Sequence, residues 1–160
     1  MNLTRLLFIL LCIPVLSFGQ GAKKLPAINA IHAYNNSSQL LNTSLPSKGK
    51  LMLIFYDPGC GHCQELGANI AKQVDRLSKT SIYFICMNDQ EYVDSYINMY
   101  AKGLRGKKNI SFWKDPGVEF IEKFQPKNYP ATYIYDAGSK SLVQDFQGEP
   151  DVKKMLSFLN

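Results

Sequence analysis

The stretch "KLMLIFYDPGCGHCQE", Lys50–Glu65, places two cysteines directly after a continuous apolar run. The run, Lys50–Tyr56, is bounded by a glycine and by an Asp-Pro pair, which is typical of a strand buried on both faces. From Gly61 to Leu77, apolar residues recur at helical spacing. The sequence therefore predicts that Cys60 and Cys63 lie where a buried strand ends and a helix begins.

The rest of the chain alternates further strands and helices. Strands are predicted at 81–88, 131–136 and 141–148, and helices at 89–101, 117–124 and 151–159. The polar lead-in, 23–47, is expected to hold one short strand. A strand, a helix and a strand in succession form a parallel crossover unit, and the last two strands suit a hairpin. We therefore predict an α/β fold, with a central mixed β-sheet flanked by helices.

The N-terminus resembles a signal peptide. Arg5 gives the N-terminal region a positive charge, and Leu6–Leu16 forms an apolar segment. Ser17 and Gly19 are small residues at positions −3 and −1 of a cleavage site before Gln20. Residues 1–19 are thus predicted to be removed and 20–160 to form one domain, a length that suits a single core. The protein is then exported, with an uncleaved N-terminal anchor as the alternative, into a compartment where disulfides persist.

The charge of the chain does not indicate a nucleic-acid partner. The formal net charge is +5, and the densest basic patch is Lys102–Lys108. Two glycines in that patch indicate a solvated loop, and no aromatic stacking pattern accompanies it. No long apolar patch argues for a dimer, and the sequence does not determine the oligomeric state.

The positions of the two cysteines predict different roles. A helix N-terminus presents free N–H groups and the positive end of the dipole, so Cys60 is expected to have a lowered pKa and to attack a disulfide. Cys63, one turn later, is expected to be buried and to resolve the mixed disulfide. Gly59 and Gly61 are expected to let the backbone turn and to leave the Cys60 sulfur open. His62 adds positive charge, which favours a more oxidising pair.

Two other uses of the pair fit the sequence less well. A zinc site needs about four ligands, and Cys86 and His32 are the obvious remaining donors. A structural disulfide between Cys60 and Cys63 would close a very short loop and constrain the unfolded chain little. We therefore expect a redox pair that needs neither a metal nor an organic cofactor. Cys86, within an aromatic strand, is expected to be an inert core thiol.

These segments resemble the thioredoxin superfamily. "LMLIFYDPGCGHC" is similar to the strand and active-site turn of that family. The dipeptide between its two cysteines, Gly61-His62, is similar to that of protein disulfide isomerase domains. "YPATYIYD" resembles the segment that carries the family's cis-proline. The layout is most similar to exported bacterial oxidoreductases of the TlpA/ResA type. The resemblance implies a thioredoxin fold, a periplasmic location, a redox-active Cys60–Cys63 disulfide, a cis Pro130 facing it, and substrate pairing with the backbone of Tyr129.

The sequence also departs from the family pattern. Gly59 stands where many members have tryptophan, and Ile54 and Leu66 stand where members carry acids. Asp57 and Glu65 are the candidates to replace these acids as the proton acceptor of Cys63. Each also has a simpler interpretation, since Asp57 can start the turn and Glu65 can compensate the helix dipole.

The resulting hypothesis is an exported thiol–disulfide oxidoreductase. It would exchange electrons with disulfides or dithiols of other exported proteins through a mixed disulfide at Cys60. The layout favours a reductase supplied by a membrane thiol donor, whereas His62 favours an oxidase or isomerase. The rival hypothesis is a thioredoxin-fold module that binds extended peptides without turnover, which the missing acids would suit.

Overall fold

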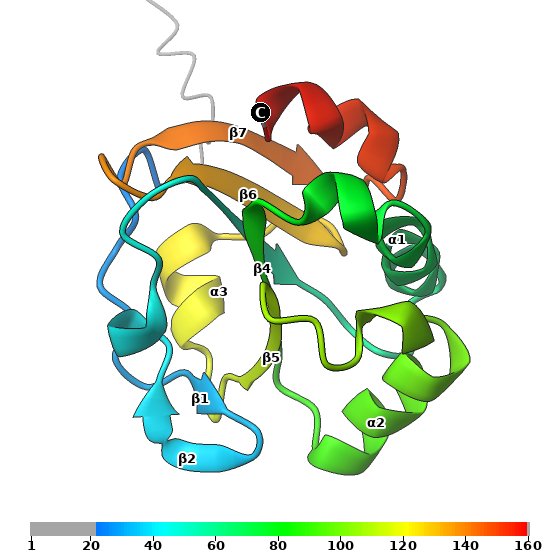
Figure 1. Cartoon of the computed structure of the whole chain (residues 1–160). Coiled ribbons are helices and arrows are strands. Elements are labelled where there is room, and N and C mark those ends of the chain that lie inside the picture. The colour runs from blue at the N-terminus through cyan, green and yellow to red at the C-terminus, as the bar shows by residue number, and fades with distance from the viewer. Residues whose placement is uncertain (1–21, 160) are drawn as a thin grey trace, which may run out of the picture.

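The computed structural model describes residues 22–159, whose seven strands lie in one sheet with helices on both faces (Figure 1). The strand order is β2-β1-β5-β4-β3-β6-β7. The strands are β1 (His32–Ala33), β2 (Asn36–Leu40), β3 (Lys50–Phe55), β4 (Thr80–Cys86), β5 (Ile110–Lys114), β6 (Ala131–Asp136) and β7 (Leu142–Gln147). The α-helices are α1 (Gly61–Lys72), α2 (Gln90–Met99) and α3 (Glu119–Phe124). The 3-10 helices are η1 (Asn42–Ser44), η2 (Val74–Leu77), η3 (Lys102–Leu104) and η4 (Val152–Phe158).

The sheet is mixed, as the sequence predicts. β3, β4 and β5 are parallel neighbours, whereas β6 is antiparallel to β3 and β7 is antiparallel to β6. β3 lies between β4 and β6, and its residues Leu51–Phe55 are almost fully buried. A strand covered on both faces needs apolar side chains at every position, which explains the uninterrupted run in the sequence.

Two hydrophobic cores lie on opposite faces of the sheet. Met52 and Ile54 point into a core covered by α1, α2 and η4. Leu51, Leu53 and Phe55 point into the other core, beneath α3 and the lead-in segment. Each fully buried side chain of this size contributes about 1.5–3 kcal/mol to folding. Among the described residues, the two cores together draw on side chains from Ile28 to Leu159.

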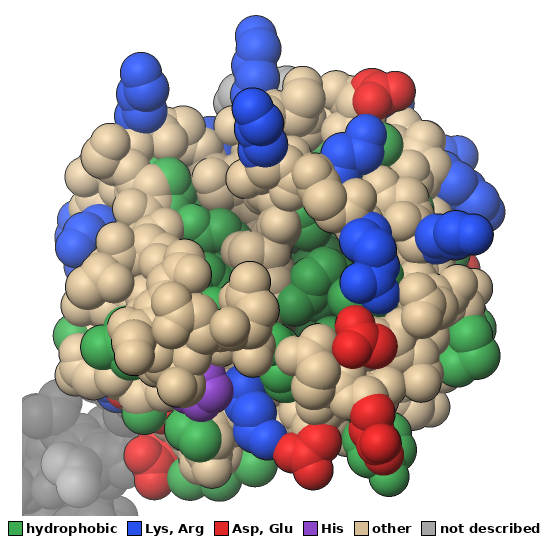
Figure 2. Space-filling model, turned by 60° about the horizontal axis from the view of Figure 1, so that its bottom comes forward, with side chains coloured by type: hydrophobic (Ala, Val, Ile, Leu, Met, Phe, Trp, Pro, Cys, Tyr) green, Lys and Arg blue, Asp and Glu red, His purple; other side chains and the backbone are tan. Residues whose placement is uncertain are grey.

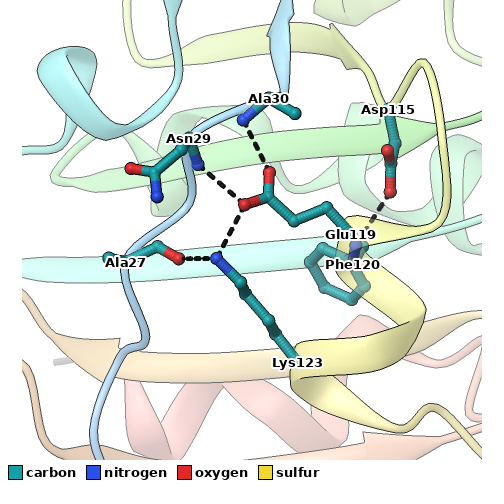
Figure 3. A network of polar contacts seen from close by, with 7 residues as sticks. All are labelled: Ala27, Asn29, Ala30, Asp115, Glu119, Phe120 and Lys123. Carbon is teal, nitrogen blue, oxygen red and sulfur yellow. Dashed lines mark hydrogen bonds and ion pairs between the residues drawn. The ribbon is translucent and has the colours of Figure 1, made fainter.

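A polar cluster ties the lead-in segment to α3 (Figure 3). The Glu119 carboxylate accepts hydrogen bonds from the backbone N–H groups of Asn29 (2.8 Å) and Ala30 (2.7 Å). Lys123, one turn later, pairs with Glu119 at 2.7 Å and donates to the carbonyl of Ala27. We call Glu119, Asn29, Ala30 and Lys123 the Glu119 clamp. Beside it, the buried Asp115 carboxylate accepts the N–H of Phe120 at 2.8 Å.

Several predicted boundaries were wrong. The first helix ends at Lys72 and not at Leu77, because the chain leaves α geometry at Gln73 (φ −110°) and continues as η2. The last segment is the 3-10 helix η4, in which buried Val152 and Met155 are three residues apart, the repeat of such a helix. The lead-in holds two strands where one was expected, since β1 pairs with both β2 and β5.

The predicted signal peptide, residues 1–19, lies outside the described residues. Within 22–159, no helix combines the length and the apolar character that a membrane crossing requires.

Candidate active site

The two cysteines lie at the junction of β3 and α1, as predicted. Cys60 is the residue directly before the helix, with extended backbone angles (φ −80°, ψ 124°). Its N–H donates to the carbonyl of Asp57 (3.0 Å), and its own carbonyl accepts the N–H of Gln64 (3.0 Å). Cys63 lies in the first turn of α1. The strand end and the helix start thus hold both ends of the turn and place the two sulfurs on one side of it.

The two thiols differ in exposure. Cys60 is partly exposed and Cys63 is buried, and both are free thiols that lie close to each other. Burial is the main cause that raises the pKa of Cys63, and the neighbouring Cys60 thiol and Asp57 carboxylate raise it further. A hydrogen bond with the backbone of Asp57 lowers this pKa, but it does not outweigh the other effects. Cys63 therefore stays protonated near neutral pH and needs a proton acceptor before it can act as a nucleophile.

Asp57 is a candidate proton acceptor for Cys63, because its carboxylate acts electrostatically on that thiol. Its Oδ1 accepts the N–H of Gly59 at 2.8 Å, which is the turn-starting role that the sequence suggests. Its charge also contributes to the raised pKa values of Cys63, Cys86 and Tyr129, mainly caused by burial, so it lies within electrostatic reach of all three. Glu65 is exposed on α1, and its carboxylate forms no hydrogen bond or ion pair with residues 22–159.

A cis-proline lies opposite the cysteine pair. The Tyr129–Pro130 peptide bond is cis, which confirms the expectation from the resemblance. The register explains its place, because Ala131 pairs with Phe55 at the end of β3 and so brings Pro130 beside the active-site turn. The carbonyl oxygen of Tyr129 lies 3.9 Å from the sulfur of Cys60. The ring of Tyr129 is 41% exposed and packs 5.5 Å from that of Phe55.

The residues around Cys60 leave it accessible. Gly59, Gly61 and His62 are all exposed. A Cβ atom at Gly61 would meet nothing within 4 Å, so the space beside this glycine is open. Neither glycine has a positive φ, and the turn therefore does not require their conformational freedom. The charge of His62 is a minor cause of the lowered pKa of Glu149, which results mainly from hydrogen bonds donated by Lys154 and Asp151.

The positions that carry acids in the resembling family are apolar here. Ile54 and Leu66 are fully buried in the core beneath α1. Cys86 is also fully buried, as predicted, and burial raises its pKa. The hydroxyl of Tyr34 lies 3.1 Å from the Cys86 sulfur. This contact could not be predicted from a local pattern, because Tyr34 is far from Cys86 in the chain. Tyr96 was likewise missed, although its hydroxyl donates to the carbonyl of Cys63 at 3.0 Å.

A hollow of about 200 Å³ lies between the β1–β2 turn and α2, and Figure 2 looks onto this side of the molecule. Its floor is hydrophobic and includes Val93, Ile97 and Phe112, and Arg105 and Asp94 form an ion pair at its rim.

Within residues 22–159, no three His, Cys, Asp or Glu side chains lie close enough together to hold a metal ion.

Comparison with solved structures identifies the architecture. A thioredoxin-like protein from Aeropyrum pernix superposes with a TM-score of 0.65, at 14% identity, over 82% of this chain and 88% of that protein. The chain has a thioredoxin fold. A secreted disulfide oxidoreductase of Mycobacterium tuberculosis superposes with a TM-score of 0.57, at 19% identity, over 74% of this chain and 84% of that protein. No protein-family model and no curated protein matches the sequence.

The thioredoxin fold also supports other thiol chemistry. The bacterioferritin comigratory protein of Xanthomonas campestris, described with alkyl peroxide reduction activity, superposes with a TM-score of 0.66 at 12% identity, over 86% of this chain and 94% of that protein. Likeness at such low identity establishes the fold alone. The activity of this chain has to be argued from its own cysteines.

Proposed function

We propose that this protein is a thiol–disulfide oxidoreductase that works through the Cys60–Cys63 pair. The observation that carries the proposal is the arrangement of a partly exposed and a buried free thiol at a helix start, opposite the cis Tyr129–Pro130 bond. An accessible sulfur can meet a partner, and a buried sulfur one turn later can attack only its neighbour. That division of roles is what disulfide exchange needs.

The exchange conserves atoms and electrons. The Cys60 thiolate attacks one sulfur of a substrate disulfide, and the other substrate sulfur leaves as a thiolate and takes a proton from water. Cys63 then loses its proton and attacks the Cys60 sulfur, which releases the second substrate thiolate. Two electrons pass to the substrate, and the Cys60–Cys63 pair becomes a disulfide. The same steps in reverse oxidise a substrate dithiol.

The reduction potential of the pair tests the proposal and its direction. Residues 20–160 are equilibrated with glutathione buffers, and the thiols are then trapped and counted. A reduction potential of about −270 mV indicates a reductase, and a potential of about −180 mV or above indicates an oxidase or isomerase. If no reversible couple forms between Cys60 and Cys63, the proposal is wrong.

A trapping variant tests whether exported proteins with cysteines are the substrates. Cys63→Ser leaves Cys60 able to attack but removes the group that releases the substrate, so mixed disulfides accumulate. The adducts are separated on non-reducing gels and identified by mass spectrometry. Cys60→Ser is the matched control, and it should trap nothing. Equal trapping by both variants would mean that capture is non-specific.

A peptide-binding module without turnover is the second candidate, and one observation favours it. Ile54 and Leu66 are buried and apolar, so these two positions offer no proton acceptor for Cys63. A binding module keeps its affinity for a partner peptide after Cys60→Ser, whereas the oxidoreductase loses its covalent exchange. Measuring peptide binding and disulfide reduction on the same variant separates the two functions.

We also propose that residues 1–19 direct export, most consistently to a bacterial periplasm. The apolar run Leu6–Leu16 supports this, as does the secreted oxidoreductase that shares the fold. After expression in a bacterium, the mature protein should be recovered from the periplasm with Gln20 as its first residue. Recovery from the membrane with Met1 retained would indicate an uncleaved anchor.

A further inference from the structure

The end of the sheet opposite Cys60 gathers positive charge. Because β3, β4 and β5 are parallel, the loops that lead into them meet at one end, and the β6–β7 turn joins them because β6 is antiparallel to β3. These segments carry nine basic and two acidic side chains. We call them the basic end, which consists of 22–25, 47–50, 75–80, 106–110 and 136–141.

Direct contacts hold these segments together. The hydroxyl of Tyr135 donates to the carbonyl of Ala22 (2.9 Å), and Lys24 donates to the carbonyl of Ser139 (3.0 Å). The N–H of Ala137 donates to the carbonyl of Gly49 (2.9 Å). In Figure 1 the blue start of the described chain runs beside the orange β6–β7 turn. These contacts join 22–25, 47–50 and 136–141.

The side chains of Asn109 and Lys50 complete this surface. The Asn109 amide donates to the carbonyls of Leu77 (3.0 Å) and Thr80 (2.8 Å), which joins the loops before β4 and β5. A hollow of about 440 Å³ lies at this end and is lined in part by Lys50, Arg76 and Lys79, and also by the Asp136 carboxylate that pairs with Lys50. Arg76 and Lys79 form no ion pair with another described residue and can face an anionic group there.

The charge of the basic end contrasts with that of the remaining described chain. The basic end has a formal excess of seven positive charges, whereas the rest of 22–159 carries eight basic and eleven acidic side chains. Of the ion pairs between described residues, one lies wholly within the basic end, Lys50–Asp136 at 3.6 Å. Most of these cations therefore stay available to an external anionic surface.

We propose that the basic end binds the anionic headgroups of a membrane surface and holds Cys60 away from it. Two observations select lipid as the occupant. The described chain begins at this end, at Ala22, and the apolar run Leu6–Leu16, which we propose directs export before it is removed, brings this end of the chain to a membrane. Clustered lysines at a membrane surface are attracted to anionic lipids, and no aromatic pattern for stacking nucleic-acid bases accompanies them. This proposal does not depend on the redox chemistry of Cys60.

The test measures binding of residues 20–160 to lipid vesicles by co-sedimentation. Vesicles that contain phosphatidylglycerol are compared with vesicles of phosphatidylcholine alone, at about 0.05 M and about 0.5 M salt. Wild-type protein should bind the anionic vesicles, and the higher salt should weaken that binding. Replacing Lys79→Gln and Lys108→Gln together should lower the partition coefficient on the order of 25-fold, about fivefold for each charge.

The matched control removes two cations at the other end of the strands. Lys114→Gln and Lys127→Gln together cause the same loss of charge, and binding should change no more than about twofold. Equal losses in the two double variants would overturn the proposal, because binding would then follow net charge alone. Binding to duplex DNA without binding to anionic vesicles would also overturn it and would assign the surface to nucleic acid.

Discussion

The active-site turn and the Glu119 clamp use polar groups in opposite ways. The Glu119 carboxylate accepts two backbone N–H groups and an ammonium, so its bonding capacity is largely used. The Cys60 sulfur is partly exposed, and it contacts the neighbouring Cys63 thiol and, at 3.9 Å, the carbonyl of Tyr129. Groups that are fully paired stabilise a fold, whereas a reactive group has to be left available. Changes in the turn should therefore alter activity, and changes in the clamp should alter stability.

The largest effect is expected from Cys60→Ser. Disulfide reductase activity should fall on the order of 10³-fold or more, because the attacking sulfur is lost. The unfolding midpoint should barely change, since the side chain is partly exposed. Cys86→Ser is the control, and its activity should stay within about twofold of wild type. An inactive Cys86→Ser that still folds would show that the buried thiol takes part in the chemistry.

The release of substrate from Cys60 should depend strongly on pH. Because burial raises the pKa of Cys63, its thiolate fraction grows about tenfold for each pH unit from neutral to mildly alkaline conditions. Single-turnover resolution of a mixed disulfide should accelerate accordingly. With Asp57→Asn, the resolution rate at pH 7 should fall if the carboxylate accepts the Cys63 proton. An unchanged rate would leave Asp57 with its turn-forming role alone.

Glu119→Gln should lower the free energy of unfolding by about 1.5–3 kcal/mol, because it removes charge-assisted hydrogen bonds. Burial alone would raise the pKa of Glu119, but hydrogen bonds from Asn29, Lys123 and Ala30 outweigh it and the pKa is lowered. A depressed pKa in the folded state stabilises the protein above the ordinary value of about 4.5. This contribution is lost as the pH falls through the folded-state pKa, so variant and wild type should converge in acid.

Glu122→Gln is the matched control for the clamp. Glu122 is exposed on the same helix, and its replacement should change stability by no more than about 0.5 kcal/mol. Denaturant unfolding at neutral and acidic pH measures both variants. Similar losses for Glu119→Gln and Glu122→Gln would mean that helix charge, and not the clamp, is responsible.

A pair of glycines tests how packing supports the active-site turn. A Cβ atom at Gly67 would lie 2.2 Å from the hydroxyl of Tyr96, which is buried and donates to the carbonyl of Cys63. Gly67→Ala should therefore cost about 1–3 kcal/mol of stability. On the same helix, a Cβ atom at Gly61 would meet nothing within 4 Å, so Gly61→Ala should raise the free energy of unfolding by about 0.4–1 kcal/mol. Thermal unfolding of the two variants should move in opposite directions.

Much of the site could be predicted from local patterns. The buried β3, the helix after it and the place of Cys60 and Cys63 between them follow from the periodicity of about thirty residues. The 3-10 form of η4 did not follow, because a short amphipathic segment has nearly the same pattern in either helix. Tyr34 contacts Cys86, and Tyr96 donates to the carbonyl of Cys63. Both contacts join distant parts of the chain, so no local pattern could reveal them.

The sequence by itself determined the α/β layers and the position of the cysteine pair at the start of α1. Both depend on hydrophobic periodicity and on short-range spacing, which are properties of neighbouring residues. The tertiary structure alone decided how far the Tyr129 carbonyl lies from the Cys60 sulfur, that Tyr96 bonds to the Cys63 carbonyl, and that loops far apart in sequence form one basic end. These features depend on strand order and register, and the physical reason is that parallel pairing brings together segments that local forces leave independent.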